Sequence, residues 1–287
     1  MEIPDFAKVG ICRYAPAIQT RNDELMNTDL HGLQALVCGS TQGIGRAIAR
    51  ELAEMGASVC LFARDENKLR TEADKLDRRR GQVHGWLCAD FDRPEEVRSA
   101  VERYLAGVKI VHILVNNSGG PAPGEIINAQ PDEFVRAFSR HLLSNQTITQ
   151  ALVPGMIKAG YGRIINVIST SVVVPIPGLG VSNTIRGAVA SWAKTLSNEL
   201  AAYGITVNNI LPGLTMTGRL ESLIRTRAQD QGISDEEQRN RMLRTIPAGR
   251  FADSSEPAAL AAFLASPASG YITGTSIRVD GGSTPAF

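Results

Sequence analysis

The 287-residue chain is poor in cysteine, carries almost no net charge and contains no long hydrophobic run. Its cysteines form no Cys-x-x-Cys pair and no histidine cluster accompanies them, so a metal site is not expected. Most of them lie in or beside apolar runs typical of strands. We therefore expect reduced, mostly buried thiols in a cytoplasmic protein at Cys12, Cys38, Cys60 and Cys88.

The formal net charge of +1 gives no basis for binding nucleic acid or a membrane surface through bulk electrostatics. No apolar run approaches the roughly 18 residues that a membrane span requires, and the N-terminus lacks the pattern of a signal peptide. The densest basic run, Arg78-Arg79-Arg80, is expected to be a solvated helix end. With 43% hydrophobic and 21% charged residues, the composition is that of a globular protein with a sizeable core.

Residues 1–28 differ from the rest of the chain, with scattered charge, prolines and no steady hydrophobic period. We interpret them as an N-terminal extension or arm; the alternatives are a flexible segment, a segment packed on a neighbour, and a start-site extension without a role. Residues 29–287 alternate between short apolar runs and longer helical stretches. This alternation predicts a single α/β domain of the Rossmann type, a doubly wound seven-stranded parallel sheet with helices on both faces.

The strands are expected at 34–38, 58–62, 84–88, 111–115, 163–168, 205–210 and 275–279. The helices are expected at 44–55, 65–79, 94–106, 131–158, 183–202, 219–231 and 256–265. The polar stretch 218–248 comes after the sixth strand, at the edge where parallel sheets bind ligands. A mobile helical lid and an extra solvated helix pair are equal alternatives for it.

A glycine-rich turn comes directly after the first strand and opens a helix. In the first βαβ unit this context is a strong signal for a dinucleotide pyrophosphate, because the glycines allow a tight turn and close backbone approach. The helix N-terminus adds free N–H groups and a positive dipole. The cofactor-binding residues predicted here are Gly39, Ser40, Thr41, Gln42, Gly43, Ile44 and Gly45.

At the end of the second strand stands Arg64, where a carboxylate would select NAD. A guanidinium there can hold a 2′-phosphate in bidentate fashion, so the sequence favours NADP, with NADPH preferred over NADH. The alternative is a solvated arginine at the start of a helix.

From about Thr28 to the C-terminus the chain resembles the short-chain dehydrogenase/reductase superfamily. The motifs that carry this resemblance are the glycine-rich loop, Asn116-Asn117-Ser118-Gly119, Pro212-Gly213, and Val279-Asp280-Gly281-Gly282. The resemblance implies further cofactor contacts at Asp90, Asn116, Ser118, Gly119, Arg186, Pro212, Gly213, Thr215 and Thr217. It also implies a homo-oligomer, a dimer or a tetramer, with the 131–158 and 183–202 helices at interfaces.

The catalytic positions depart from that family. Ser169 matches the family serine, but Ser182 stands where the catalytic Tyr is expected and Arg186 where the Lys is expected. His141 takes the place of a helix Asn that anchors a relay water. The resemblance implies catalytic roles for these four residues, with a rewritten proton route. The missing Tyr and a Gly-Pro loop are also similar to a divergent branch of the family that includes a bacilysin-pathway reductase.

These departures differ in their chemistry. Arg186 lies one helical turn beyond Ser182 and can bind ribose hydroxyls, but a permanent cation cannot relay a proton. Ser182 can donate a hydrogen bond, yet it is a far weaker acid than a phenol. His141 is either the general acid, directly or through a relay, or a buried histidine hydrogen-bonded in place of Asn. No tyrosine is well placed to substitute among Tyr14, Tyr104, Tyr161, Tyr203 and Tyr271.

These observations predict an NADPH-dependent oxidoreductase, a reductase that acts on a small carbonyl or conjugated enone. The apolar stretch 172–180 favours an apolar small-molecule substrate, although core packing explains it equally well. The alternative is a catalytically inactive NADP(H)-binding protein of the same fold, with a sensor or structural role. Neither nucleic acid nor a membrane is expected as a partner.

Overall fold

The computed structural model describes residues 26–286, so the predicted arm lies almost entirely outside the described residues. One parallel sheet has the strand order β3-β2-β1-β4-β5-β6-β7. Its strands are β1 (Gln34–Cys38), β2 (Ser58–Ala63), β3 (Gly85–Cys88), β4 (Ile113–Asn116), β5 (Gly162–Val167), β6 (Ile205–Pro212) and β7 (Ser276–Val279). The predicted seven-stranded parallel sheet is confirmed.

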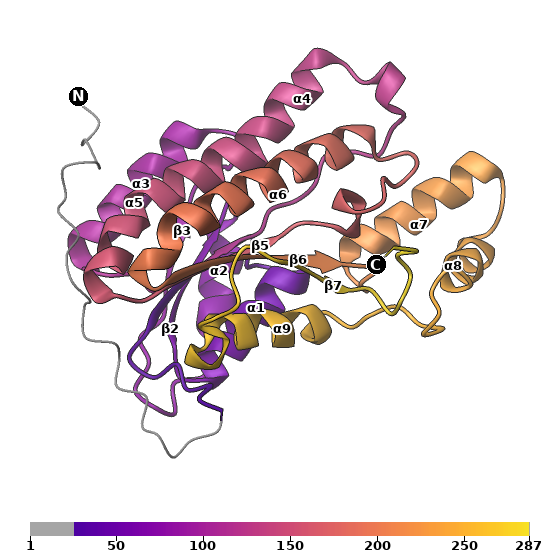
Figure 1. Ribbon diagram of the computed structural model, residues 1–287. Coiled ribbons are helices and arrows are strands. Elements are labelled where there is room, and N and C mark those ends of the chain that lie inside the picture. The colour runs from indigo at the N-terminus through magenta and orange to yellow at the C-terminus, as the bar shows by residue number, and fades with distance from the viewer. Residues whose placement is uncertain (1–25, 287) are drawn as a thin grey trace.

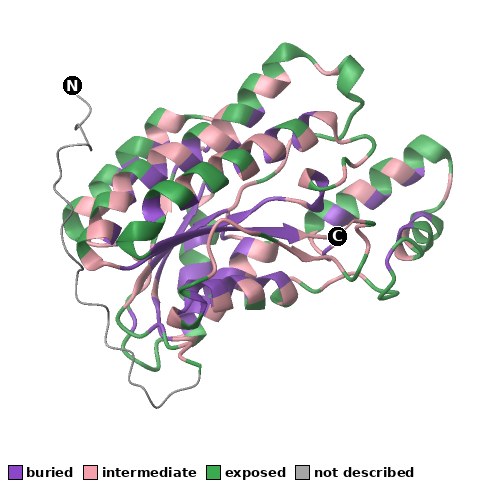
Figure 2. Cartoon of the chain, viewed as in Figure 1, coloured by how far each residue is buried: buried purple, intermediate pink, exposed green. Residues whose placement is uncertain are grey.

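Helices cover both faces of the sheet (Figure 1). One face packs against α1 (Gly43–Glu54), α2 (Glu66–Ala73) and α9 (Ser255–Ala265). The other packs against α3 (Pro94–Gly107), α5 (Ser144–Ala159) and α6 (Gly180–Leu200). Strands β4 and β5 are buried along their whole length, and Figure 2 shows this buried centre between the two helical layers. Short turns stand at η2 (Ile126–Asn128), η4 (Thr170–Val172), η5 (Ala201–Tyr203) and η6 (Pro267–Ser269).

The predicted helix 131–158 is three consecutive pieces: α4 (Pro131–Phe138), a π-helical turn η3 (Ser139–Leu143), and α5. A π turn holds one more residue than an α turn, and such turns are frequent at functional sites. The stretch 218–248 forms α7 (Gly218–Gln231) and α8 (Asp235–Leu243). Helix α7 matches the predicted helix 219–231, and a second helix agrees with the helix pair that was one alternative for this stretch, although the bounds of α8 were not predicted.

Helix α2 is shorter than predicted and ends at Ala73. The Arg78 guanidinium turns back and donates to the carbonyls of Ala73, Asp74 and Leu76. It thereby satisfies carbonyls that a helix end leaves without partners, so the helix stops there at little cost.

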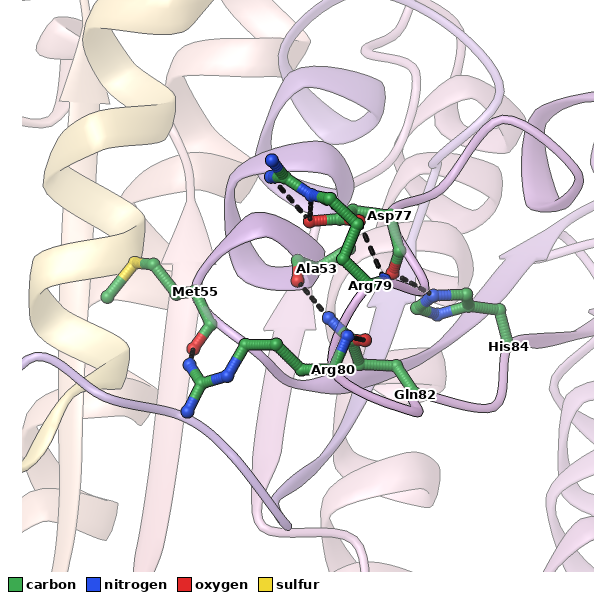
Figure 3. Close-up of polar contacts among 7 residues, drawn as sticks. All are labelled: Ala53, Met55, Asp77, Arg79, Arg80, Gln82 and His84. Carbon is green, nitrogen blue, oxygen red and sulfur yellow. Dashed lines mark hydrogen bonds and ion pairs between the residues drawn. The ribbon is translucent and has the colours of Figure 1, made fainter.

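The basic run continues into a loop that packs on the end of α1 (Figure 3). Arg79 forms an ion pair with Asp77 at 2.8 Å, and its hydrogen bonds lower the pKa of Asp77 to about 2. Arg80 donates to the Met55 carbonyl, and Gln82 donates to the Ala53 carbonyl at 2.8 Å. The three arginines are exposed, as expected, but they are not only solvated, because Arg78 caps the end of α2 and Arg80 ties the loop to the end of α1.

Strands β3 and β4 begin later than expected because histidine side chains accept hydrogen bonds from backbone N–H groups of the neighbouring strands, in place of backbone carbonyls. The Nδ1 atoms of His84 and His112 accept the N–H groups of Val59 and Gln34, each at 3.1 Å. Desolvation lowers the pKa of both rings, which keeps them neutral acceptors at neutral pH.

Cys38 and Cys60 are buried as expected, whereas Cys88 is exposed at the end of the edge strand β3. Cys12 lies outside the described residues. Within residues 26–286, no helix is long and apolar enough to cross a membrane. In the same range no group of three or more histidine, cysteine or acidic side chains is arranged to hold a metal ion.

A row of buried amides, which we call the asparagine ladder, crosses four strands at one level. Asn116, Asn166, Asn209 and Ser276 stand opposite one another on β4, β5, β6 and β7. Each amide nitrogen donates to the oxygen of the next residue, at 2.9, 2.9 and 3.0 Å. A slip of one residue between any two of these strands would break the row, so the ladder fixes their register.

We expect Asn166→Leu to lower the free energy of unfolding by about 2–5 kcal/mol, because it leaves amide groups on both sides without partners in a buried site. Ser276→Ala is the control, since this residue is exposed and water can take the place of its hydroxyl as a hydrogen-bond acceptor. The control should lower the free energy of unfolding by less than about 1 kcal/mol. Urea unfolding of the two variants measures the difference, and equal losses would refute the ladder as the register constraint.

Candidate active site

The carboxyl ends of β1, β4, β5 and β6 open into a groove made of two adjoining cavities. The smaller, about 280 Å³, lies beside the glycine-rich loop, and the larger, about 680 Å³, lies against α6, α7 and α8. The two adjoin, because six residues lie in the walls of both, namely Ile44, Asn117, Ser118, Gly119, Thr217 and Arg219. The groove lies where the strand order reverses between β1 and β4, the place at which doubly wound sheets bind ligands.

The glycines of the first loop are required by close contacts. Gly39 has φ +59°, and a Cβ added to it would lie 2.7 Å from the side-chain nitrogen of Asn117. A Cβ on Gly45 would lie 2.6 Å from the same nitrogen and would collide with the Gly39 carbonyl oxygen. Asn117 Nδ2 donates to the carbonyls of Cys38 and Gly39 at 3.3 and 3.2 Å. Asn117, which the sequence reasoning left out, therefore holds the loop in shape.

Three predicted cofactor residues support the groove instead of lining it. The buried Ser40 hydroxyl accepts the N–H of Phe62 at 3.0 Å, Asn116 belongs to the asparagine ladder, and Gly45 packs behind the loop. The other predicted cofactor residues lie in the wall: Gly39, Thr41, Gln42, Gly43, Ile44, Arg64, Asp90, Ser118, Gly119, Arg186, Pro212, Gly213, Thr215 and Thr217.

Arg64 is exposed in the wall of the smaller cavity and forms no hydrogen bond or ion pair through its guanidinium within residues 26–286. Arg140, which was not predicted, lies in the same wall. Its Nε donates to Asp92 at 2.6 Å and its Nη1 to the Gly119 carbonyl at 3.2 Å. The bond from Arg140 lowers the pKa of Asp92. Arg140 is thus committed to protein partners, while Arg64 is available to a ligand.

Three predicted catalytic residues meet in the larger cavity. Ser169 comes after β5 and accepts the N–H of Ser171 at 3.1 Å, whereas Ser182 and Arg186 lie one turn apart on α6 and are both buried. Arg186 donates to the Val167 carbonyl at 2.9 Å. Desolvation and then the charge of Arg219 lower the pKa of Arg186 to about 10, so it remains a cation at neutral pH.

His141 is buried in the π turn and does not line the groove. Its Nδ1 lies 2.7 Å from the hydroxyl of Ser118, and its Nε2 has no partner in the described part of the chain. Desolvation, together with the smaller effects of the charges of Arg186, Arg140 and Arg219, lowers the pKa of His141 well below its usual value. A neutral imidazole bonded to Ser118 fits the hydrogen-bonded alternative and does not fit a direct general acid.

No tyrosine among residues 26–286 lines the groove. The Tyr161 hydroxyl donates to the Ala265 carbonyl at 2.7 Å, and burial raises its pKa to about 12. Tyr104 packs in the core beneath the sheet, while Tyr203 and Tyr271 are exposed. Tyr14 lies outside the described residues.

Helices α7 and α8 form one wall of the larger cavity, with their outer faces exposed. Thr217 caps α7 by accepting the N–H of Leu220 at 3.4 Å. Arg219 donates to the carbonyls of Gly120 and Pro121 at 2.9 and 3.0 Å, which ties the start of α7 to the loop after β4. The helix pair is therefore part of the site, and its mobility stays a prediction.

The comparisons with known proteins agree with this geometry. A family model described as enoyl-(acyl carrier protein) reductase matches residues 39–284. The chain is 34% identical over 256 residues to the 3-oxoacyl-acyl-carrier-protein reductase FabG of Vibrio cholerae, covering 88% of this chain and 98% of that protein. It is 34% identical over 257 residues to a D-beta-hydroxybutyrate dehydrogenase of Rhizobium meliloti, covering 87% and 98%.

Solved structures share the whole fold. An L-sorbose reductase from Gluconobacter frateurii, complexed with NADPH and L-sorbose, has a TM-score of 0.86 at 30% identity and covers 91% of this chain and 100% of that one. YwfH, an NADPH-dependent reductase involved in bacilysin biosynthesis, has a TM-score of 0.84 at 26% identity, covering 89% and 99%. The chain therefore belongs to the short-chain dehydrogenase/reductase superfamily of oxidoreductases.

Proposed function

We propose that this protein is an NADPH-dependent reductase of a small carbonyl or conjugated enone. The observation that carries the proposal is the groove of two adjoining cavities. One arm combines the glycine-rich loop with the uncommitted guanidinium of Arg64, and the other presents Ser169, Ser182 and Arg186. The neighbours whose structures contain or use NADPH support the choice of cofactor.

The residues present fit a dinucleotide. No side chain separates a ligand from the backbone at Gly39 and Gly43, and α1 begins there with free N–H groups for a pyrophosphate. Arg64 would hold a 2′-phosphate, and Arg186 would hold ribose hydroxyls. The cofactor, when bound, supplies a hydride to the electrophilic carbon of the substrate.

The protein's own part is to polarise the substrate. The hydroxyls of Ser169 and Ser182 both open into the larger cavity, where they can donate to the substrate oxygen as negative charge develops on it. The buried cation of Arg186 adds a positive potential on the same helix face. None of these groups is an acid that gives up its proton at neutral pH.

The proton is proposed to come from water in the groove. Reduction of an enone adds the hydride at the β-carbon and leaves an enolate, which water can protonate at carbon, so the site needs no phenol. His141 would act as a positioning residue, since its ring bonds the Ser118 hydroxyl that borders both cavities.

A second candidate is an inactive NADP(H)-binding protein with a sensor or structural role. The observation in its favour is that no tyrosine within residues 26–286 reaches the groove. Both candidates bind the cofactor in the smaller cavity, and they differ only in whether a substrate is reduced in the larger cavity.

We further propose a cytoplasmic homo-oligomer, a dimer or a tetramer. The surface of α4 and η3 exposes large apolar side chains, with Val135 63% and Leu143 41% exposed. Exposed apolar residues gathered on one surface are typical of a protein interface.

We expect Arg64→Leu to weaken NADPH binding by about 10- to 100-fold, because it removes charge-assisted hydrogen bonds to a 2′-phosphate. Binding of NADH should change less than about threefold. Arg70→Leu, an exposed arginine of α2 outside the groove, is the control. Fluorescence titration gives the dissociation constants. Equal weakening of both cofactors would contradict the assignment of Arg64.

We expect Ser169→Ala to lower kcat/KM for an enone by about 100-fold or more, since a donor to the developing oxyanion is lost. The double variant Ser182→Tyr with Arg186→Lys restores the family pair and should reduce this activity. A large gain in ketone reduction by the double variant, from a wild type without turnover, would instead favour the inactive alternative. Oxidation of NADPH monitored by absorbance measures all three proteins.

We expect His141→Asn to remove part of the acid sensitivity of folding. The pKa of His141 is lowered in the folded state, so below pH ~6.5 the unfolded chain takes up a proton that the folded chain does not. Wild-type stability therefore falls with decreasing pH by up to about 1.4 kcal/mol per unit from this group, and is unaffected by it above pH ~6.5.

Urea unfolding from pH ~5 to ~8 measures this slope in both proteins. The pH profile of kcat should stay the same in the variant. If kcat of the wild type instead falls as pH rises toward ~6.5, in the range of the lowered pKa of His141, and the variant lacks that limb, His141 is the general acid after all.

A further inference from the structure

The ionisable side chains in the wall of the larger cavity are all of one sign. Arg186, Arg219, Arg227 and Arg241 line it, and its described wall contains no aspartate, glutamate, lysine or histidine. Arg186 is buried and Arg227 is half-buried, and neither forms an ion pair in the described part of the chain, whereas Arg219 and Arg241 are exposed. A desolvated guanidinium without a counter-ion is costly, so such a wall is expected to receive an anion.

The four arginines differ in the hydrogen bonds and ion pairs that their guanidinium groups already form with the protein. Arg241 forms an ion pair with Glu237 at 2.6 Å. Arg186 and Arg219 donate to backbone carbonyls at about the ideal distance, 2.9 Å each. Arg227 makes only a long contact, 3.5 Å to the Pro177 carbonyl, and forms no ion pair in the described part of the chain. Arg227 is the least committed of the four.

The placement of Arg227 results from helix geometry. Arg219, Leu223, Arg227 and Gln231 recur every fourth residue of α7, and all four line the cavity. Arg219 also borders the smaller cavity, whereas Arg227 lies two turns further along, about 12 Å at 1.5 Å per residue. Arg219 therefore adjoins the proposed cofactor arm, and Arg227 belongs to the substrate arm alone. Figure 1 shows α7 extending away from the sheet toward α8.

Neutral polar and apolar groups complete this end of the cavity. Gln238 of α8 is buried in the wall, and its Oε1 has no partner in residues 26–286. Leu223, which lies between Arg219 and Arg227 on the same face of α7, lines the cavity together with Met242, and so do Val174 and Ile176 of the apolar stretch. The cavity thus combines apolar side chains with the cation of Arg227.

We propose that the substrate carries a carboxylate, which Arg227 binds at the end of the cavity formed by α7 and α8, with an apolar segment between it and the reacting group. This inference rests on the proposed reductase function. The charge balance favours a monoanion, because Arg227 and Arg241 together with Glu237 leave a single positive charge at that end. Gln238 and Gln231 offer amide N–H groups to the second carboxylate oxygen.

Binding of inert probes tests the proposal without turnover. Phenylalkanoates with three to six chain carbons, and their primary amides, are titrated into the NADPH-loaded full chain by calorimetry. We expect at least one carboxylate to bind about tenfold or more tightly than its amide. Arg227→Gln should abolish that preference, and Arg225→Gln, an exposed arginine of the same helix that does not line the cavity, should keep it. The melting temperature and NADPH affinity of both variants should match the wild type.

Several results would overturn the proposal. They are equal binding of acids and amides, no binding of any carboxylate, equal effects of the two variants, or tighter binding of a matched phenylalkyl phosphate.

Oxidation of NADPH with 4-formylbenzoate and its methyl ester separates this failure from that of the reductase function. If the ester is reduced at the same rate as the acid, the proposed carboxylate site is refuted and the reductase function is supported. If carboxylates bind through Arg227 but neither aldehyde is reduced, the site stands and the reductase function fails.

Discussion

The asparagine ladder fixes the register of four strands, and the groove residues at or beyond the carboxyl ends of β4, β5 and β6 depend on that register. Asn117 and Ser118 come directly after Asn116, Ser169 stands three positions beyond Asn166, and Pro212 stands three beyond Asn209. With a rise of about 3.3 Å per residue, a slip of one position would move any of these groups out of the wall and turn it to the other face. The three asparagine amides of the ladder are buried, so the hydrogen bonds between them face little competition from water, and wrong registers leave amides without partners.

Burial and positive charge together set the protonation state of His141 beside the groove. Desolvation has the largest effect, and the charges of Arg186, Arg140 and Arg219 add to it, so the pKa is lowered and the ring stays neutral. The same charges suit a dinucleotide phosphate and an anionic substrate, which would offset them on binding. Because this ring stays neutral at neutral pH, it is not the imidazolium acid that would supply a proton, and we expect water to supply it instead.

Much of the fold could be predicted from the sequence because alternating apolar runs and glycine turns are local signals. The end of α2 and the starts of β3 and β4 were missed because Arg78, His84 and His112 replace backbone partners with side-chain atoms, which no periodicity shows. At the end of β4, the sequence could not show that the Asn116 amide donates to Asn166 of the sheet, while the Asn117 amide donates to Gly39 of the glycine-rich loop.

The candidate site was predicted unevenly for similar reasons. Short motifs located the cofactor wall, since a glycine loop can hardly serve another geometry. The four-residue spacing that places Arg219 and Arg227 in the substrate wall is visible in the sequence, but only the packing of α7 shows which face looks inward. Ser182 and Arg186 are visible as well, at the positions where the resemblance leads us to expect Tyr and Lys, yet what they do depends on the proton route and not on the fold.

Helices α7 and α8 pack around a small apolar cluster of their own, made of Leu220, Ile224 and Met242, which is separate from the two cores that flank the sheet. Opening this pair would break the arginine bonds to Gly120, Pro121 and Pro177 while leaving both main cores intact. We therefore expect the pair to be less stable locally than the sheet, so that its backbone amides exchange with solvent through partial opening before the sheet unfolds. Access to the groove and the global stability of the protein are set by different contacts, so either can change in evolution without the other.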